Sequence, residues 1–192
     1  DFIYSQTIPT ESLQLWLCAD SVELTDGKVS RWYDLSPNQH IIQQTTDEAM
    51  PTINSSAING QPTICFNGTS TFLAGENILN LETSNWIWFI VEKANINNRA
   101  NTRYISKGIA GGFQYGIYTI ASNGWIYHDG TGVIKLDFNA TDGFHIDTWV
   151  RNYTENIIKY SKDNEINDTH SLSQSNLQSN GKFFVGAYSN GQ

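Results

Sequence analysis

The feature that most constrains the fold of this chain is a repeated alternation of apolar and polar residues in short runs. Leu13, Leu15 and Leu17 show it first, with a leucine at every second position. A period of two is typical of a β-strand with one buried face, because successive side chains point to opposite sides of a sheet. Pairs that tolerate the positive φ of a hairpin turn, Asp-Gly or Asn-Gly, stand at residues 26–27, 59–60, 123–124 and 129–130.

No stretch has the apolar stripe and end caps of a three-turn helix, so the sequence predicts an all-β fold. Residues 113–121, 125–128 and 133–138 are expected to form the clearest antiparallel meander. Trp86 to Val91 is apolar throughout, and we expect it to be a central strand covered on both faces. So many short strands without helices indicate a two-sheet antiparallel sandwich with jelly-roll or related connections. The other strands are expected at 13–18, 29–33, 63–66, 103–108, 145–153, 157–161, 165–166 and 182–188.

Length and charge limit the classes of function. The 192 residues suit one domain that spans residues 1–192, and the 39% of hydrophobic residues can supply its core. A formal net charge of -8 would repel nucleic-acid phosphates and anionic lipids. No apolar run reaches the roughly 18 to 20 residues that a membrane span needs. We therefore expect neither a nucleic-acid partner nor membrane insertion.

An ordered set of residues in the first third of the chain resembles a known family. Its members are Leu15-Trp16-Leu17, Val29, Trp32, Asp34, Ser36, Gln44, Pro51, Asn59-Gly60, Pro62 and Phe66-Asn67-Gly68. Together they resemble the concanavalin A-like lectin/glucanase superfamily, in particular the laminin-G-like jelly-roll modules of bacterial surface proteins and phage structural proteins. The resemblance implies a further closing strand after Val185 to Gly191. We expect this chain to lack that strand.

The same superfamily includes glycan-cleaving enzymes, which need two carboxylates facing a groove. Their usual signature is a pair of acidic residues two or four positions apart on one strand. No expected strand carries this pair, and Asp163, Glu165 and Asp168 lie in or beside a turn. The four histidines also lack the spacing of a zinc site. We therefore expect a protein that is not an enzyme.

Calcium is the only cofactor that the sequence suggests. Asp20, Asp34 and Asn67 place oxygen ligands in loops at the ends of strands, and relatives often have an acidic residue where Asn67 stands, in a loop that can hold calcium. The alternative, which we favour, is that Asp20 and Asp34 cap turns by accepting backbone hydrogen bonds. No other cofactor is expected.

Aromatic and polar residues of the meander could bind carbohydrate. Sugar rings dock on aromatic side chains through their apolar C–H faces, while Asn, Asp and His bind the hydroxyl groups. The alternative is that these aromatic rings fill the core between the sheets. The candidate residues are Tyr115, Trp125, Tyr127, His128 and Asp129.

These observations favour a non-enzymatic recognition or adhesion module that binds glycans. We expect it to belong to a larger virion protein (a phage fibre, tail or capsid-decoration protein) or to a secreted cell-surface protein, and so to lie outside the cell or on a virion. Its partners would be a glycan or cell-surface receptor and other proteins of the same assembly, and oligomerisation is left open. A purely structural assembly domain is the first alternative and a glycan-cleaving enzyme the second.

Cys18 and Cys65 lie in two expected strands, either as a disulfide or as two free thiols.

Overall fold

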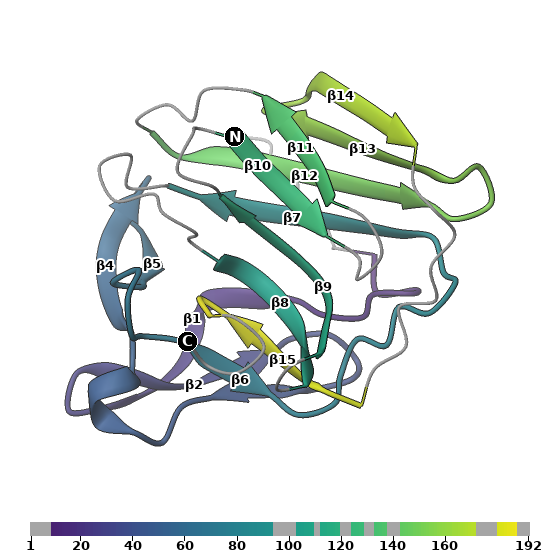
Figure 1. Cartoon of the computed structure of the whole chain (residues 1–192). Coiled ribbons are helices and arrows are strands. Elements are labelled where there is room, and N and C mark those ends of the chain that lie inside the picture. The colour runs from purple at the N-terminus through teal and green to yellow at the C-terminus, as the bar shows by residue number, and fades with distance from the viewer. Residues whose placement is uncertain are drawn as a thin grey trace.

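The computed structural model describes residues 9–93, 103–109, 112–119, 124–128, 133–137, 143–171 and 180–187. Within these residues the chain forms two antiparallel β-sheets, one of eleven strands and one of four. Strands β9 to β11 cross over the smaller sheet in the view of Figure 1. Among the described residues, no helix has the length and hydropathy of a membrane span.

The larger sheet contains most of the strands. Its order is β11-β10-β9-β8-β15-β6-β3-β2-β4-β5, and β1 pairs with β2 beside this path. The bounds are β1 Leu17–Thr25, β2 Lys28–Asp34, β3 Ile41–Gln43, β4 Thr52–Ile58, β5 Gln61–Cys65, β6 Leu73–Gly75, β8 Arg103–Ile109, β9 Gly112–Thr119, β10 Gly124–His128, β11 Val133–Asp137 and β15 Lys182–Val185. A short 3-10 helix, η1 (Asp47–Ala49), lies between β3 and β4.

The smaller sheet has the order β14-β13-β12-β7. Its strands are β7 (Trp86–Glu92), β12 (His145–Asn152), β13 (Ile157–Lys162) and β14 (Glu165–Ser171). They pair with their neighbours along nearly their full lengths, with Trp149 opposite both Trp88 and Tyr160. The predicted meander is confirmed in the larger sheet, where β9, β10 and β11 are antiparallel neighbours.

The predicted turns determine how the strands reverse. Asp26 and Gly27 connect β1 to β2 with φ values of 50° and 79°, and Asn59 and Gly60 connect β4 to β5 with 51° and 77°. Two consecutive residues with positive φ match the twist of antiparallel strands, which is why these pairs favour hairpins. The strong turn signals in the first third of the chain therefore correspond to real hairpins.

The hydrophobic core lies between the two sheets. Side chains of both sheets meet in one cluster of buried residues: Val29, Ile42, Leu73, Ile105, Ile117, Trp149, Ile158, Tyr160 and Phe183. Trp88 of the smaller sheet stacks on Phe183 of the larger sheet, with ring centroids 6.1 Å apart and an interplanar angle of 14°. Burial of rings of this size contributes a large share of the stability of a sandwich.

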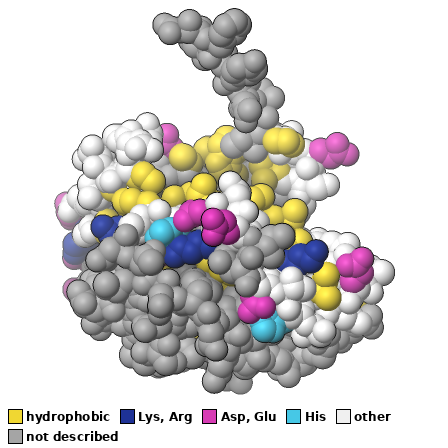
Figure 2. All heavy atoms as spheres, turned by 90° about the horizontal axis from the view of Figure 1, so that it is seen from above, with side chains coloured by type: hydrophobic (Ala, Val, Ile, Leu, Met, Phe, Trp, Pro, Cys, Tyr) yellow, Lys and Arg dark blue, Asp and Glu magenta, His cyan; other side chains and the backbone are white. Residues whose placement is uncertain are grey.

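The prediction for strand β7 is wrong in one respect. Among the described strands β7 pairs with β12 alone, so it ends its sheet rather than lying in the middle. Its inner side chains pack into the core, but Ile87, Phe89 and Val91 on the outer face are 58%, 69% and 60% exposed. An apolar run shows that a strand can be buried on both sides, but it does not show that a second layer covers it. Figure 2 shows hydrophobic side chains gathered in a band across the molecule, with acidic, basic and histidine side chains nearby.

The last described strand, β15, is an interior strand. It pairs with β8 on one side and with β6 on the other. Residues 188–192 and any later strand lie outside the described residues, so the expected lack of a closing strand stays a prediction. Cys18 and Cys65 are free thiols, which agrees with the second of the two alternatives for the cysteines.

Candidate functional site

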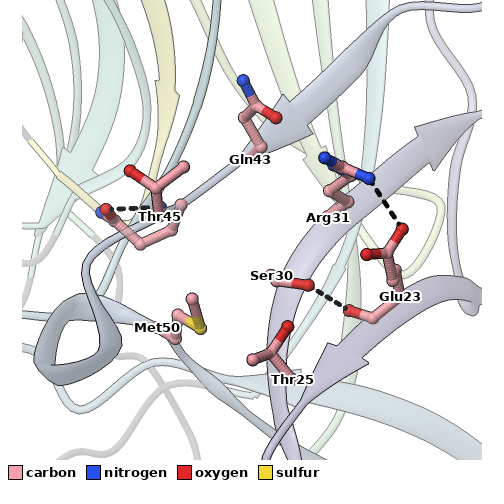
Figure 3. Close-up of a pocket in the computed structure, with 8 residues that line it drawn as sticks. Glu23, Thr25, Ser30, Arg31, Gln43, Thr45 and Met50 are labelled. Carbon is pink, nitrogen blue, oxygen red and sulfur yellow. Dashed lines mark hydrogen bonds and ion pairs between the residues drawn. The ribbon is translucent and has the colours of Figure 1, made fainter.

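A surface pocket of about 250 Å³ lies between strands β1, β2 and β3 and the segment that follows β3 (Figure 3). Every side chain that lines it is polar except Met50, which is nearly buried. The lining residues are Glu23, Thr25, Ser30, Arg31, Gln43, Gln44, Thr45 and Met50. The pocket is thus lined mainly by polar side chains, whose carbon atoms together with Met50 also give it apolar surface.

The register of three strands creates the centre of this pocket. Glu23 of β1 is opposite Arg31 of β2, and Arg31 is in turn opposite Gln43 of β3. Residues that are directly opposite in antiparallel strands have side chains on the same face of the sheet, close enough to interact. The result is a row of carboxylate, guanidinium and amide groups across three strands, which we call the Glu23–Arg31–Gln43 row.

Hydrogen bonds hold the acidic end of the row in place. Arg31 Nη1 donates to Glu23 Oε2 at 3.0 Å, and the hydroxyl of Tyr33 donates to the same oxygen at 2.6 Å. The hydrogen bond from Tyr33 and the ion pair with Arg31 lower the pKa of Glu23 below its ordinary value. Ser30 Oγ donates to the backbone carbonyl of Glu23 at 3.1 Å. Glu23 is therefore an ionised acceptor in a defined position.

A hydrogen-bonded segment forms the opposite wall. The side-chain carbonyl of Gln44 accepts hydrogen bonds from the backbone N–H groups of Thr45 and Thr46, both at 3.0 Å. Its amide nitrogen donates to the carbonyl of Phe72 at 3.4 Å. Gln44 therefore orients the chain between β3 and η1 and is not itself available to a ligand.

Several polar atoms of the row remain available. Within the described part of the chain, Glu23 Oε1 and the side-chain amide of Gln43 have no hydrogen-bond partner. Arg31 hydrogen-bonds with Glu23 and Tyr33, and a guanidinium has five N–H donors, so it keeps N–H groups beyond these two bonds. A carboxylate accepts, a guanidinium donates, and an amide does both. The pocket can therefore bind neutral groups that both donate and accept, such as hydroxyl groups.

The carbohydrate site predicted in the meander is corrected at Tyr115. This residue is only 1% exposed, and its hydroxyl donates to the carbonyl of Leu79 at 2.9 Å. The two-residue period of β9 gives it the same orientation as Ile117, a core residue, so its ring packs inside the protein. Tyr115 cannot be a surface platform for a sugar.

The other four predicted carbohydrate-binding residues are only partly placed. Trp125, Tyr127 and His128 belong to β10, where they lie opposite Thr119, Ile117 and Gly116 of β9, respectively. Their side chains lie outside the described part of the structure, and so does the whole of Asp129. A glycan site at these four residues stays a prediction.

The geometry of Asp34 does not fit the calcium interpretation. Its Oδ1 accepts hydrogen bonds from the N–H groups of Trp16 and Ser36, both at 2.8 Å. Its Oδ2 accepts from Ser36 Oγ at 2.7 Å and from the N–H of His40 at 3.1 Å. Burial alone would raise the pKa of Asp34, but these hydrogen bonds lower it below its ordinary value. Asp34 caps a turn, as the alternative proposed.

Asn67 is likewise a turn residue, whereas Asp20 lies within strand β1. Asn67 Oδ1 accepts hydrogen bonds from the N–H groups of Thr69, Ser70 and Thr71 at 2.9 to 3.1 Å. Asp20 is exposed on β1, where it hydrogen-bonds with Cys18. Among the residues that the structure describes, no three His, Cys, Asp or Glu side chains form a group suited to a metal ion. Asp34 and Asn67 therefore act as turn residues, and a calcium site at Asp20, Asp34 and Asn67 stays a prediction.

Two buried carboxylates lie between the sheets at one end of the core. Glu92 is 8% exposed and Asp147 is fully buried. The hydroxyl of Tyr104 donates to Glu92 Oε2 at 3.1 Å, and that of Tyr160 donates to Asp147 Oδ1 at 2.5 Å. Asp147 Oδ2 is buried and has no hydrogen-bond partner in the described residues.

Both carboxylates have unusual proton affinities. Burial and the charge of Asp147 raise the pKa of Glu92 to about 7. Burial also raises the pKa of Asp147. Sequence reasoning missed this pair because it searched for carboxylates along one strand, whereas Glu92 and Asp147 lie on the neighbouring strands β7 and β12. The sequence signal that could have indicated the pair is Glu92, an acidic residue directly after the apolar run 86–91.

Comparison with known proteins gives the fold. No protein-family model and no curated protein sequence matches this chain. Among solved structures, it is similar to the binding domain of botulinum neurotoxin DC in complex with SialylT, with a TM-score of 0.51 and 11% identity over 85% of this chain and 44% of that chain. The chain has a concanavalin A-like jelly-roll fold. This confirms the predicted two-sheet antiparallel sandwich.

The concanavalin A-like chain spans less than half of the toxin chain that it matches. It is also similar to Bacillus licheniformis β-glucanase, with a TM-score of 0.43 and 12% identity over 92% of this chain and 87% of that chain. Since one scaffold carries many functions, the ligand has to be argued from the site.

Proposed function

We propose that this chain is a non-enzymatic carbohydrate-recognition module and that the pocket between β1, β2 and β3 is its binding site. The observation that carries the proposal is the Glu23–Arg31–Gln43 row, which presents unpaired acceptors and donors side by side. Sugar-binding sites combine a few placed polar groups with apolar surface for the C–H face of the ring. Here Met50 and the carbon atoms of the polar side chains supply the apolar surface.

The fold supports this proposal only by analogy. The toxin binding domain to which the chain is similar is in complex with SialylT, so a protein with this architecture can be found with such a ligand. An analogy of fold does not assign a ligand to another chain. The chemistry of the pocket is what leads us to a carbohydrate.

The buried carboxylates support a role without catalysis. A glycan-cleaving enzyme needs two carboxyl groups that face the substrate across a groove. Glu92 and Asp147 are instead enclosed between the sheets and are hydrogen-bonded to buried or partly buried tyrosines. In the pocket, Glu23 is the one acidic residue of the lining, and Arg31 and Tyr33 engage it. We therefore propose recognition rather than cleavage.

A location outside the cell, on a secreted surface protein or a virion, is part of this proposal. The polar residues of the chain are mainly uncharged, and its net charge is -8, which suits a soluble surface module.

The second candidate function is an assembly domain. The exposed apolar outer face of β7 and β12, formed by Ile87, Phe89, Val91 and Ile146, favours it, because patches of this kind often mark protein contacts.

Binding of a glycan library to the wild type and to Arg31→Met tests the proposal. Loss of the guanidinium removes the central donor of the row, and we expect at least a tenfold loss of affinity with little change in melting temperature. Lys159→Met is a matched control, because Lys159 is an exposed cation on β13 of the other sheet. Equal glycan binding by the wild type and Arg31→Met would refute the pocket as the site.

A further inference from the structure

We propose that the pocket selects uncharged sugars through two neighbouring hydroxyl groups and discriminates against sugars that carry a carboxylate. This inference rests on the proposed function, since it names the class of ligand for the same pocket. It follows from the charge and geometry of the row rather than from the presence of any one residue.

The ion pair offers an acceptor next to a donor. Glu23 Oε2 and Arg31 Nη1 are 3.0 Å apart, and the two side chains are 44% and 46% exposed. The second oxygen of the Glu23 carboxylate and the remaining N–H groups of Arg31 belong to the same two charged groups, so an acceptor and a donor lie close together for hydroxyl groups on neighbouring ring carbons. One hydroxyl can donate to the free oxygen of Glu23 while the next accepts from a free N–H of Arg31. Charge-assisted hydrogen bonds of this kind are stronger than neutral ones.

The pocket has no surplus positive charge for an acidic sugar. Glu23 and Arg31 are the only formal charges among its lining residues, and they cancel. Lys28, in the same strand as Arg31, is paired with Asp47 at 2.6 Å. A sugar carboxylate placed against Arg31 would adjoin the Glu23 carboxylate, and like charges repel.

The environment of Glu23 keeps this discrimination active at neutral pH. The hydrogen bond from Tyr33 and the contact with Arg31 stabilise the ionised form of the carboxylate. An ionised carboxylate can only accept hydrogen bonds, which suits a sugar hydroxyl and not another carboxylate. Gln43, at the third position of the row, can bind a further hydroxyl in either direction.

The experiment measures affinity for matched pairs of galactosides and mannosides, each with and without a terminal sialic acid. For the wild type we expect the neutral member of a pair to bind at least tenfold more tightly. Glu23→Gln removes the negative charge but keeps an acceptor, so we expect weaker binding of neutral sugars and a relative gain for sialylated ones. Glu155→Gln, an exposed carboxylate in the turn after β12, is the matched control and should keep the wild-type ratio.

The outcomes separate this inference from the function on which it rests. Preference of the wild type for sialylated sugars, with binding lost in Arg31→Met, would overturn the inference and keep the pocket as a glycan site. An unchanged ratio in Glu23→Gln would also overturn it. If Arg31→Met binds every glycan as the wild type does, the proposed function fails. Circular dichroism of each variant checks that it is folded.

Discussion

The substitution Glu92→Gln should remove most of a pH dependence that the buried carboxylate pair gives to stability. Glu92 and Asp147 lie between the sheets, where a charge is costly unless it is paired. Glutamine keeps the shape of the side chain and an oxygen that can accept the hydrogen bond of Tyr104. It cannot ionise. The charged and titratable groups that act on the pair are Tyr104, His145, Tyr160, Lys162 and Asp163.

The size and sign of the effect follow from the pKa of Glu92. The folded state raises this pKa from 4.5 to about 7, so it binds the proton more strongly than the unfolded state does. The stability contributed by the proton is complete below pH 4.5, is lost as pH rises to about 7, and stays lost above it. One pKa unit is worth about 1.4 kcal/mol, so the loss amounts to about 3 kcal/mol.

Urea denaturation at pH 5, 6, 7 and 8 measures this loss. We expect Glu92→Gln to be close to the wild type in unfolding free energy at pH 5 and more stable by about 2 to 3 kcal/mol at pH 8. Glu155→Gln removes an exposed carboxylate outside the pair and should follow the wild-type curve. If the unfolding free energies of the wild type and Glu92→Gln change with pH in parallel, Glu92 does not cause this pH dependence and the prediction is refuted.

Two further substitutions test other parts of the structure. Asp34→Ala removes four hydrogen bonds, three from the turn at Ser36 to His40 and one from the N–H of Trp16, and we expect a loss of about 2 to 4 kcal/mol in unfolding free energy by urea denaturation. A loss below about 0.5 kcal/mol would contradict the capping role. Because the folded state lowers the pKa of Asp34, the stability from this carboxylate should be lost as pH falls below about 4. Trp125→Ala tests the carbohydrate site predicted from the sequence in the meander. That prediction requires glycan binding to be abolished while the melting temperature stays nearly unchanged. A drop of several kcal/mol in stability would instead place Trp125 in the core.

The sandwich could be predicted because its signals are local. A hairpin such as β1–β2 needs only an alternating run, two turn residues and a second run, all within a few positions of each other. Asp34 is also a local case, since its carboxylate binds the amides of Ser36 and His40 two and six residues later. Patterns of this length are visible in a single sequence.

The pocket could not be predicted because it depends on register. Arg31 meets Glu23 and Gln43 only when β1, β2 and β3 pair in one alignment, and a shift by one residue would reverse the face of each side chain. Each of the three is an ordinary surface residue in the sequence. The sequence instead favoured the aromatic residues of the meander as the binding site. Tyr115 shows why this prediction fails there, because an aromatic ring in a sandwich can fill the core as readily as it can bind a sugar.

Ionisable groups inside the sandwich are the hardest feature to infer, because their partners come from distant parts of the chain. Lys107 on β8 is fully buried, and its Nζ donates to Asn77 Oδ1 at 2.9 Å, to the carbonyl of Ile78 at 2.5 Å and to that of Gly181 at 3.0 Å. Burial lowers its pKa to about 8. The three acceptors are 29 to 74 residues away in the sequence, so no local pattern could distinguish Lys107 from an exposed lysine. The same reason hid Glu92 and Asp147, and it implies that the groups with the most unusual proton affinities in a sandwich are found by tracing contacts between strands.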